Sequence, residues 1–235
     1  MHYKRVLLKL TGELFGSKGK TGIDFIRVQR VANYLKHLQK SHEVELAIVI
    51  GGGNLFRGRN VNDTSFERAQ ADSIGMLATI MNGLALQGEL TSLGIESRVL
   101  SALHVNQACE PYIRRKAMAH LDRGIITILV GGSGRPFFST DTIAALLAAE
   151  LNCDILLKGS TVDGVYTSDP HKDPLAVKYR ELGYQEALEK GLMVMDRTAF
   201  AVCQEQKIPI IVFKVDELEN IDRILRGEAV GTLIK

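Results

Sequence analysis

The residues best suited to chemistry lie between positions 131 and 141, in the segment GGSGRPFFSTD. A β-branched apolar run at 125–130 precedes them and predicts a strand buried on both faces. The residues that follow are rich in helix formers, and Thr140 or Asp141 can cap that helix. Glycine backbone lets a ligand approach closely, a helix N-terminus favours an anion, and the Arg135 guanidinium suits phosphate. The pattern predicts a phosphate-binding loop, with a plain strand-to-helix turn as the alternative.

Glycines also follow two earlier predicted strands. The strand at 6–10 carries Lys9 near its end and is followed by Gly12, and the strand at 44–50 is followed by GGGN at 51–54. In an open parallel sheet these junctions lie along one edge, where ligands bind. Several such loops can hold two phosphate-bearing molecules in line. Phosphoryl transfer needs that geometry, because its catalysis is mostly positioning and charge neutralisation.

Neither of the two common phosphate motifs fits the chain. Gly19-Lys20-Thr21 ends like a P-loop, but the pattern requires a glycine where the chain has Leu14. The dinucleotide-binding fingerprint fails as well, because its third glycine would fall on Phe56 or Phe137.

Strands and helices alternate along the chain, which predicts an α/β fold, a three-layer sandwich around a mostly parallel central sheet. Residues 162–166 are rich in turn formers and predict a hairpin. Strands are predicted at 6–10, 44–50, 97–101, 125–130, 154–158, 208–215 and 232–234. Helices are predicted at 24–40, 66–93, 105–121, 142–151, 186–190, 196–206 and 218–226.

The chain has 235 residues, and 46% hydrophobic and 24% charged residues are ordinary for a globular protein. We expect one domain over 1–235, with a soft division into halves at 1–151 and 152–235. A net charge of +2 gives no reason to expect nucleic acid. No apolar run approaches the ~18 residues of a membrane span. No signal peptide is visible, so the cytoplasm is the expected location.

Five segments together carry a resemblance to a known family. They are KLTGE at 9–13, GGGNLFRG at 51–58, MLAT at 76–79 with NG at 82–83, GRPFFSTD at 134–141 and VDGVY at 162–166. The chain resembles the amino acid kinase family from residue 3 to 234, and within it the bacterial branch that phosphorylates uridylate (UMP). The FFSTD and MLAT segments single out that branch. Thr11 replaces the usual serine and keeps the hydroxyl, while Ser133 and Arg135 replace a usual threonine or glycine and an asparagine.

This resemblance implies an amino acid kinase fold and reversible transfer of the ATP γ-phosphoryl group to UMP, in pyrimidine nucleotide biosynthesis. It makes Lys9 and Asp141 the catalytic residues: Lys9 neutralises transition-state charge, and Asp141 holds Lys9 in place. No general base is needed, because the acceptor is already a phosphate anion. The implied ATP-binding residues are Lys9, Leu10, Thr11, Gly12, Gly53, Arg57, Lys158, Ser160, Tyr166 and Asp169. The implied UMP-binding residues are Gly52, Asp72, Ser133, Gly134, Arg135, Pro136, Phe137, Phe138, Ser139 and Thr140.

The resemblance also assigns individual roles and partners. Asp72 would take the ribose hydroxyls of UMP, Tyr166 would stack on adenine, and Arg57 would clamp phosphate. Mg²⁺ would be held mainly by the nucleotide phosphates, with no protein ligands. A homohexamer, activation by GTP and inhibition by UTP are further implications. The residues implied in the GTP response are Ser17, Lys18, Gly19, Lys20, Thr21 and Gly22.

Two other functions compete with this interpretation. One is a family member that phosphorylates a carboxylate or carbamate, which would lack the loop at 137–140 and the Asp72 anchor. The other is a catalytically silent nucleotide-binding regulator or storage protein, against which the retained Lys9 and Asp141 argue.

Overall fold

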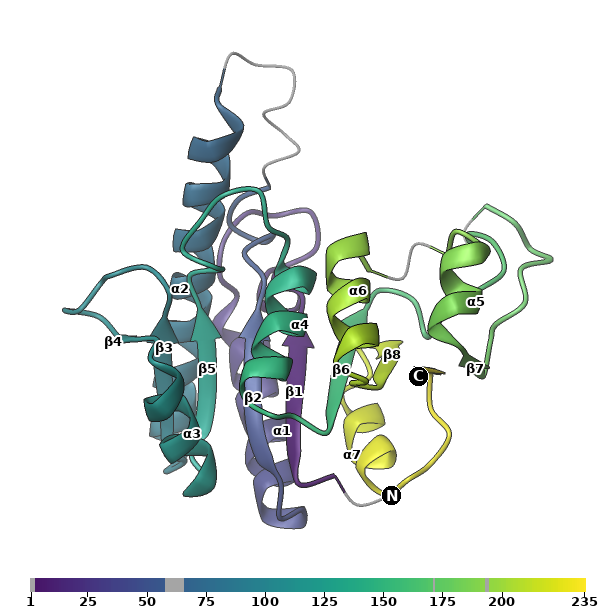
Figure 1. Cartoon of the computed structure of the whole chain (residues 1–235). Helices are drawn as coiled ribbons and strands as arrows, with labels where there is room; N and C mark the ends of the chain where they lie inside the picture. Colours follow the sequence, from purple (N-terminus) through teal and green to yellow (C-terminus); the bar gives the residue numbers. More distant parts are fainter. Residues whose placement is uncertain (1–2, 58–65, 171, 193–194) are drawn as a thin grey trace.

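The computed structural model describes residues 3–57, 66–170, 172–192 and 195–235 (Figure 1). Gly58, the last residue of the motif at 51–58, lies outside these ranges. The strands form one sheet in the order β4-β3-β5-β2-β1-β6-β8-β9-β7, parallel throughout except for the β8–β9 pair. The strands are β1 (Arg5–Leu10), β2 (Glu45–Ile50), β3 (Ser97–Ser101), β4 (Glu110–Pro111), β5 (Ile126–Val130), β6 (Ile155–Ser160), β7 (Glu181–Leu182), β8 (Ile210–Lys214) and β9 (Thr232–Ile234).

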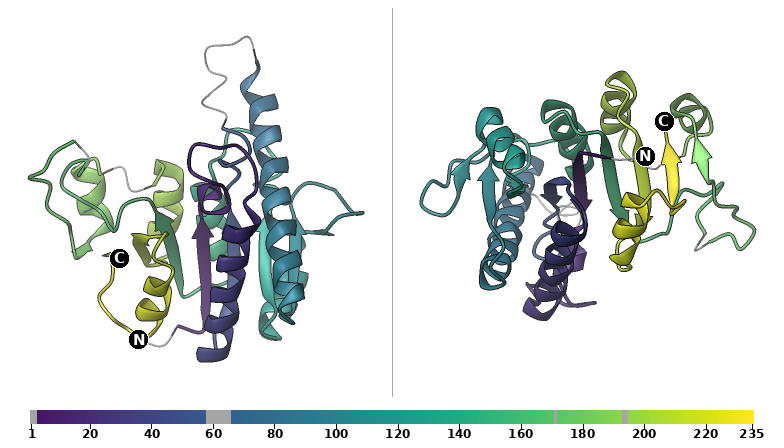
Figure 2. Two further views of the ribbon diagram at one scale, coloured as in Figure 1. Left: turned by 180° about the vertical axis from the view of Figure 1, so that it is seen from behind. Right: turned by 90° about the horizontal axis from the view of Figure 1, so that it is seen from below.

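Helices cover both faces of the sheet, as the view from below in Figure 2 shows. Helices α1, α2 and α7 contribute to the hydrophobic core on one face, and α3, α4, α5 and α6 to the core on the other. The predicted three-layer α/β sandwich is therefore confirmed. The helices are α1 (Phe25–Ser41), α2 (Arg68–Ser92), α3 (Arg114–Asp122), α4 (Thr140–Glu150), α5 (Tyr184–Glu189), α6 (Arg197–Glu205) and α7 (Glu219–Leu225), with the 3-10 helix η1 (Gly12–Phe15).

The alternation of side chains along β1 determines the direction of its lysine. Val6, Leu8 and Leu10 belong to the core beside α1 and α2, whereas Leu7 belongs to the core beside α4. Because side chains alternate with a period of two, Lys9 lies on the same face as Leu7. The only charged residue in the second half of this buried strand thus faces the helix that begins at Thr140.

The predicted helix at 105–121 is wrong in its first half. Residues 105–109 form turns, Glu110 and Pro111 form β4 beside β3, and helix α3 begins only at Arg114. Pro111 has no N–H to donate and pushes the residue before it into an extended conformation. The predicted hairpin at 162–166 is a series of turns, with a single antiparallel bridge from Tyr166 to Lys178.

Helix α2 runs unbroken through the three glycines that the sequence places in it. A Cβ on Gly83 would lie 2.6 Å from Cγ1 of Val130, so this glycine allows the helix to pack closely on β5. The sheet also continues across the expected division near Asn152, because β1 pairs in parallel with β6. Within the described ranges, no helix combines the length and apolar character needed to cross a membrane.

Candidate active site

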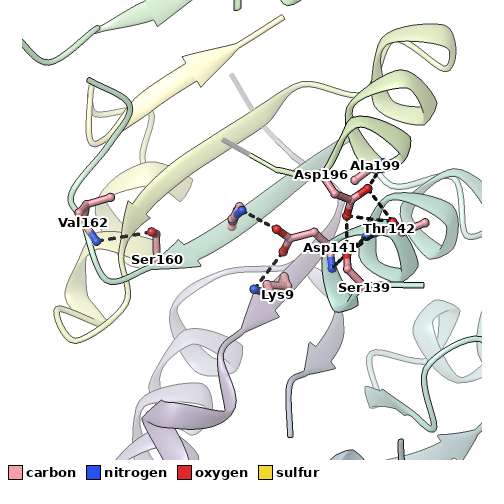
Figure 3. A network of polar contacts seen from close by, with 9 residues as sticks. Lys9, Ser139, Asp141, Thr142, Ser160, Val162, Asp196 and Ala199 are labelled. Atoms are coloured by element: carbon pink, nitrogen blue, oxygen red, sulfur yellow. Dashed lines mark hydrogen bonds and ion pairs between the residues drawn. The ribbon is translucent and has the colours of Figure 1, made fainter. Parts of the chain in front are cut away.

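Two lysines from neighbouring strands meet one carboxylate at the carboxyl end of the sheet, and Figure 3 shows Lys9 beside Asp141. The parallel register places Lys9 of β1 opposite Lys158 of β6, so both side chains leave the same face. Asp141 lies in the first turn of α4, which covers that face. Its Oδ1 is 3.0 Å from Nζ of Lys9, and its Oδ2 is 2.6 Å from Nζ of Lys158. The structure therefore brings together three of the predicted site residues.

This triad is strongly desolvated, and its charges depend on one another. Burial alone would raise the pKa of Asp141, but Lys9 and Lys158 outweigh it and hold that pKa below its ordinary value. Burial lowers the pKa of Lys158, while Asp141 opposes that shift. The more distant carboxylate of Asp196 also opposes the lowering of the Lys158 pKa. The two ammonium groups lie in a low-dielectric environment, where their interaction with a phosphoryl group would be strong.

Asp196 fixes the start of α4 and was not among the predicted site residues. Ser139 is the N-cap of α4, and its Oγ accepts hydrogen bonds from the N–H groups of Asp141 and Thr142, both at 3.1 Å. The Ser139 hydroxyl in turn donates to Asp196, and Thr142 Oγ1 donates to Asp196 Oδ1 at 2.8 Å. Asp196 also caps α6 through the N–H of Ala199. The carboxylate thus ties α4 to α6, and the Ser139 hydroxyl is engaged in the cap.

Close glycine contacts shape the junctions after β1 and β2. A Cβ on Gly12 would lie 2.6 Å from both the Gly51 oxygen and the Gly53 nitrogen. A Cβ on Gly52 would lie 2.8 Å from Cβ of Ala78 on α2. A Cβ on Gly53 would meet nothing within 4 Å. Packing therefore requires glycine at Gly12 and Gly52, whereas the Gly53 backbone faces open space.

Two cavities open at this edge of the sheet, and they share Gly53 and Phe56. The first cavity has a volume of about 670 Å³ and the second about 450 Å³. A ligand in each would approach the other at Gly53, which is the arrangement that transfer between two bound molecules requires. The first cavity is lined by Thr11, Gly53 and Arg57 of the predicted ATP set and by Ser17, Lys18, Gly19, Lys20 and Thr21 of the predicted effector set. The second is lined by Gly52, Asp72, Ser133, Arg135, Phe138, Ser139 and Thr140 of the predicted UMP set.

Arg57 reaches across the glycine turn at the rim of the first cavity. Its Nε donates to the Gly53 oxygen at 3.1 Å, and its Nη2 lies 2.5 Å from Oε1 of Glu13. Glu13 thereby orients the guanidinium, a role that the sequence analysis did not assign. Both side chains are about half exposed, so the ion pair is free to exchange for a phosphate contact.

Asp72 anchors the loop of the second cavity from α2. Its Oδ2 accepts a hydrogen bond from the Phe137 N–H at 2.8 Å, and its Oδ1 accepts one from Nε of Arg68 at 2.9 Å. Phe137 has φ of 73°, a left-handed conformation that is uncommon for a residue other than glycine. The carboxylate therefore supports a strained turn. The other predicted UMP residues, Gly134, Pro136 and Phe137, line neither cavity.

The predicted adenine and ribose contacts lie apart from both cavities. Ser160, Tyr166 and Asp169 line neither of them. The Tyr166 hydroxyl donates to Oδ1 of Asp163 at 2.5 Å, and that hydrogen bond raises the pKa of Tyr166. Asp169 is exposed, with Lys172 3.8 Å away. Of the other predicted ATP residues, Thr11, Gly53 and Arg57 line the first cavity, whereas Lys9, Leu10, Gly12 and Lys158 line neither. The ATP-binding role of the whole set remains a prediction.

Nowhere in the described part of the chain do three or more His, Cys, Asp or Glu side chains form a group able to hold a metal ion. Mg²⁺ is usually held by one or two carboxylates together with substrate phosphates, which does not require such a group.

A parallel sheet with glycine-rich strand ends, a buried cationic triad and two adjoining cavities define a phosphotransferase that acts on phosphate-bearing substrates. The family profile described as "Amino acid kinase family" matches residues 4–214. The chain belongs to the amino acid kinase family. It is 49% identical to a uridylate kinase of Nocardioides sp. over 233 residues, which is 99% of this chain and 98% of that relative.

Solved structures agree with this assignment. A UMP kinase from Bacillus anthracis is 40% identical with a TM-score of 0.96, covering 100% of this chain and 97% of the other. A UMP kinase from Ureaplasma parvum is 35% identical with a TM-score of 0.93, covering 100% of both chains. The predicted amino acid kinase fold is confirmed.

Proposed function

We propose that this chain transfers the γ-phosphoryl group of ATP to UMP, giving ADP and UDP. It is similar over nearly its whole length to a uridylate kinase. The observation that carries the proposal is the meeting of the two cavities at Gly53. ATP would place its phosphates in the first cavity, between Thr11 and Gly53, and UMP would occupy the second.

The triad would supply the electrostatic part of the reaction. Lys9 and Lys158 present two ammonium groups that Asp141 holds in place, so they would stabilise the negative charge of the phosphoryl group in transit. The attacking UMP phosphate oxygen is already an anion, so Asp141 is not needed as a base. Its lowered pKa keeps it ionised at neutral pH, as holding the lysines requires. Bound Mg²⁺ would neutralise further phosphate charge, with the phosphates as its ligands.

The choice of acceptor is tested by ADP release. ATP and Mg²⁺ are supplied with UMP, CMP, dUMP, AMP, acetylglutamate or aspartate in separate reactions. Fast turnover with UMP alone is the expected result. Turnover with an amino acid in place of UMP would leave the fold intact and overturn the assignment of the second cavity. Nucleotide binding without any turnover would favour a regulatory or storage protein.

Replacing Asp72 by alanine should raise KM for UMP about ten-fold or more and leave KM for ATP nearly unchanged. The carboxylate lines the second cavity, where we propose that it takes the ribose hydroxyls. It also supports the Phe137 N–H, so Asp72→Asn is the matched variant: its amide oxygen can still accept that hydrogen bond. Steady-state kinetics with each nucleotide varied separates the two effects. An unchanged KM for UMP in both variants would reject the ribose role.

The loop at 17–22 shares the first cavity with the predicted ATP phosphates. We infer that Lys18 and Lys20 act on the triphosphate there, so that a GTP response through this loop would reach the ATP site directly. Lys18→Ala combined with Lys20→Ala should raise KM for ATP roughly 30-fold, since each of the two charges near phosphate contributes about 1 kcal/mol in solvent. Lys116→Ala, an exposed lysine on α3, is the control. Loss of GTP activation with KM for ATP unchanged would make the loop an effector site only.

A homohexamer, GTP activation and UTP inhibition remain proposals. Support for assembly comes from apolar side chains left exposed along α2, where Ile74, Leu77 and Met81 are 38%, 48% and 52% exposed. Their spacing places them along one side of the helix. Light scattering of the full chain tests the proposal, and a monomer at micromolar concentration would contradict it.

A further inference from the structure

Two buried asparagines form a reciprocal amide pair beneath the glycine turn. Asn82 of α2 is fully buried, and Asn54, in the loop after β2, is 7% exposed. Nδ2 of Asn82 donates to Oδ1 of Asn54 at 2.7 Å, and Nδ2 of Asn54 donates to Oδ1 of Asn82 at 3.0 Å. Each amide gives its second hydrogen to a backbone carbonyl: Asn82 to Gly51 at 2.8 Å, and Asn54 to Gly22 at 3.1 Å. Every amide hydrogen is therefore used, as a buried polar network requires.

Asn54 is the end of this pair that lies at the first cavity. It lines that cavity and packs against Gly12, the first residue of η1, and Gly16, the residue after it. A Cβ built on Gly12 would lie 2.8 Å from Oδ1 of Asn54. A Cβ built on Gly16 would lie 2.7 Å from the Cβ of Asn54. The Gly22 N–H donates a hydrogen bond to the backbone carbonyl oxygen of Asn54 at 3.0 Å. The loop at 17–22, whose residues 17–21 line the first cavity, is thus held to Asn54 at Gly22.

Asn82 belongs to the helix that lines the second cavity. Three residues before it, Thr79 Oγ1 accepts a hydrogen bond from the Gly131 N–H at 2.8 Å. Helix α2 therefore holds the β2 junction through Asn82 and the β5 junction through Thr79. Asp72, Met76 and Thr79 of the same helix line the second cavity. A movement of the loop at 17–22 can be transmitted through the two amides to the α2 residues that line the second cavity.

We propose that Asn54 and Asn82 are positioning residues that hold the Gly51–Gly53 turn between the two nucleotides and couple their binding. The inference rests on the proposed two-nucleotide reaction. Removing either amide breaks both reciprocal bonds; loss of Asn82 also leaves the Gly51 carbonyl without its amide donor, and loss of Asn54 does the same to the Gly22 carbonyl. The backbone must relax to satisfy these buried groups. Because Gly53 borders both cavities, that relaxation changes how the binding of one nucleotide affects the other.

The test is the dissociation constant of UMP, measured by calorimetry with and without a non-hydrolysable ATP analogue and Mg²⁺. In the unmodified chain the two constants should differ by about five-fold or more. Asn54→Ala and Asn82→Ala should each abolish most of that difference. The double variant should lose no more than either single one, because the pair acts as one unit. Equal constants with and without the analogue in the unmodified chain would overturn the proposal.

Further variants separate positioning from general destabilisation. Asn82→Asp keeps the shape and the acceptor for Asn54 but loses the donors to Gly51 and Asn54, so it should also lose the coupling. Leu86→Ala, a fully buried core residue on the same helix, should lower Tm and leave the coupling intact. Unaltered coupling in folded Asn82→Asp, or an equal loss in Leu86→Ala, would overturn the proposal. Failure of UMP to bind the unmodified chain would instead contradict the proposed function.

Discussion

Lys9→Ala is expected to lower kcat by about three orders of magnitude while both nucleotides still bind. Lys9 projects from the end of β1 into the buried triad, with Nζ 3.0 Å from Asp141. Its charge would act on the phosphoryl group in transit, and Thr11 and Gly53 in the first cavity would still hold the triphosphate. Rapid-quench measurement of UDP formation, together with calorimetry for each nucleotide, separates chemistry from binding.

Lys4→Ala is the matched control, because Lys4 precedes the same strand but its side chain is 76% exposed beside Glu45. That variant should turn over normally. Lys9→Ala also removes a repulsive neighbour of Lys158, so the pKa of Lys158 should rise and Tm should change little. Turnover equal to that of the unmodified chain would reject the role of Lys9. A loss confined to ATP affinity would make it a binding residue only.

Much of this site could be predicted because local pattern determines it. The apolar run at 6–10 predicted a strand that carries Lys9 near its end, and a strand followed by glycines and a helix placed Asp141 at a helix start. Parallel pairing then brought the ends of β1, β2 and β6 to one edge. The sequence motifs therefore named residues that the fold does place together.

Local sequence patterns did not predict the contacts between residues that lie far apart in the chain. Asp196 is 57 positions from Ser139 and looks in sequence like an ordinary helix cap. Asn54 and Asn82 are 28 positions apart, and nothing in either segment indicates that their amides bond reciprocally. Such pairings depend on tertiary packing, so a single sequence carries only weak signals for them. Pro111 was different, because its effect on the expected helix at 105–121 is local and could have been anticipated.

The loop at 17–22 shows the limit of resemblance alone. The motif connected it with an effector, and the fold places it in the same cavity as Thr11 and Gly53. Tyr166 and Asp169, which the resemblance assigned to ATP, lie outside both cavities, as do Lys9, Asp141 and Lys158. Residue type and motif position predicted which side chains are candidates for nucleotide binding. Only the arrangement of the loops shows which of these side chains line the same cavity.

Asp141→Asn should lower kcat about 10²-fold with both KM values nearly unchanged. The amide keeps the size of the side chain but loses the charge that holds Lys9 and Lys158, and small displacements of a reacting group cost rate steeply. Asp141 also opposes the lowering of the Lys158 pKa by burial. Its removal should therefore move the alkaline limb of the pH–kcat profile to lower pH. An unchanged profile would show that Lys158 takes no part in the protonation state that limits turnover.

The same substitution should destabilise the fold by about 3 kcal/mol at neutral pH, because it leaves two desolvated lysines without their counter-charge. The Asp141 pKa lies below its ordinary value in the folded chain, so its stabilising effect is complete above about pH 4 and is lost as pH falls through the folded pKa. The Lys158 pKa in the folded chain is also below its ordinary value. The free-energy cost of burying its charge therefore disappears as the pH rises through that folded pKa.

The destabilisation by Asp141→Asn should therefore be largest near neutral pH and shrink toward both extremes. Urea unfolding of the variant and the unmodified chain across that range measures the difference. Asp163→Asn is the control, since its ion pair with Lys178 is 44% and 38% exposed and should contribute about 1 kcal/mol or less. A pH-independent difference for Asp141→Asn would mean that the carboxylate acts through hydrogen bonding alone.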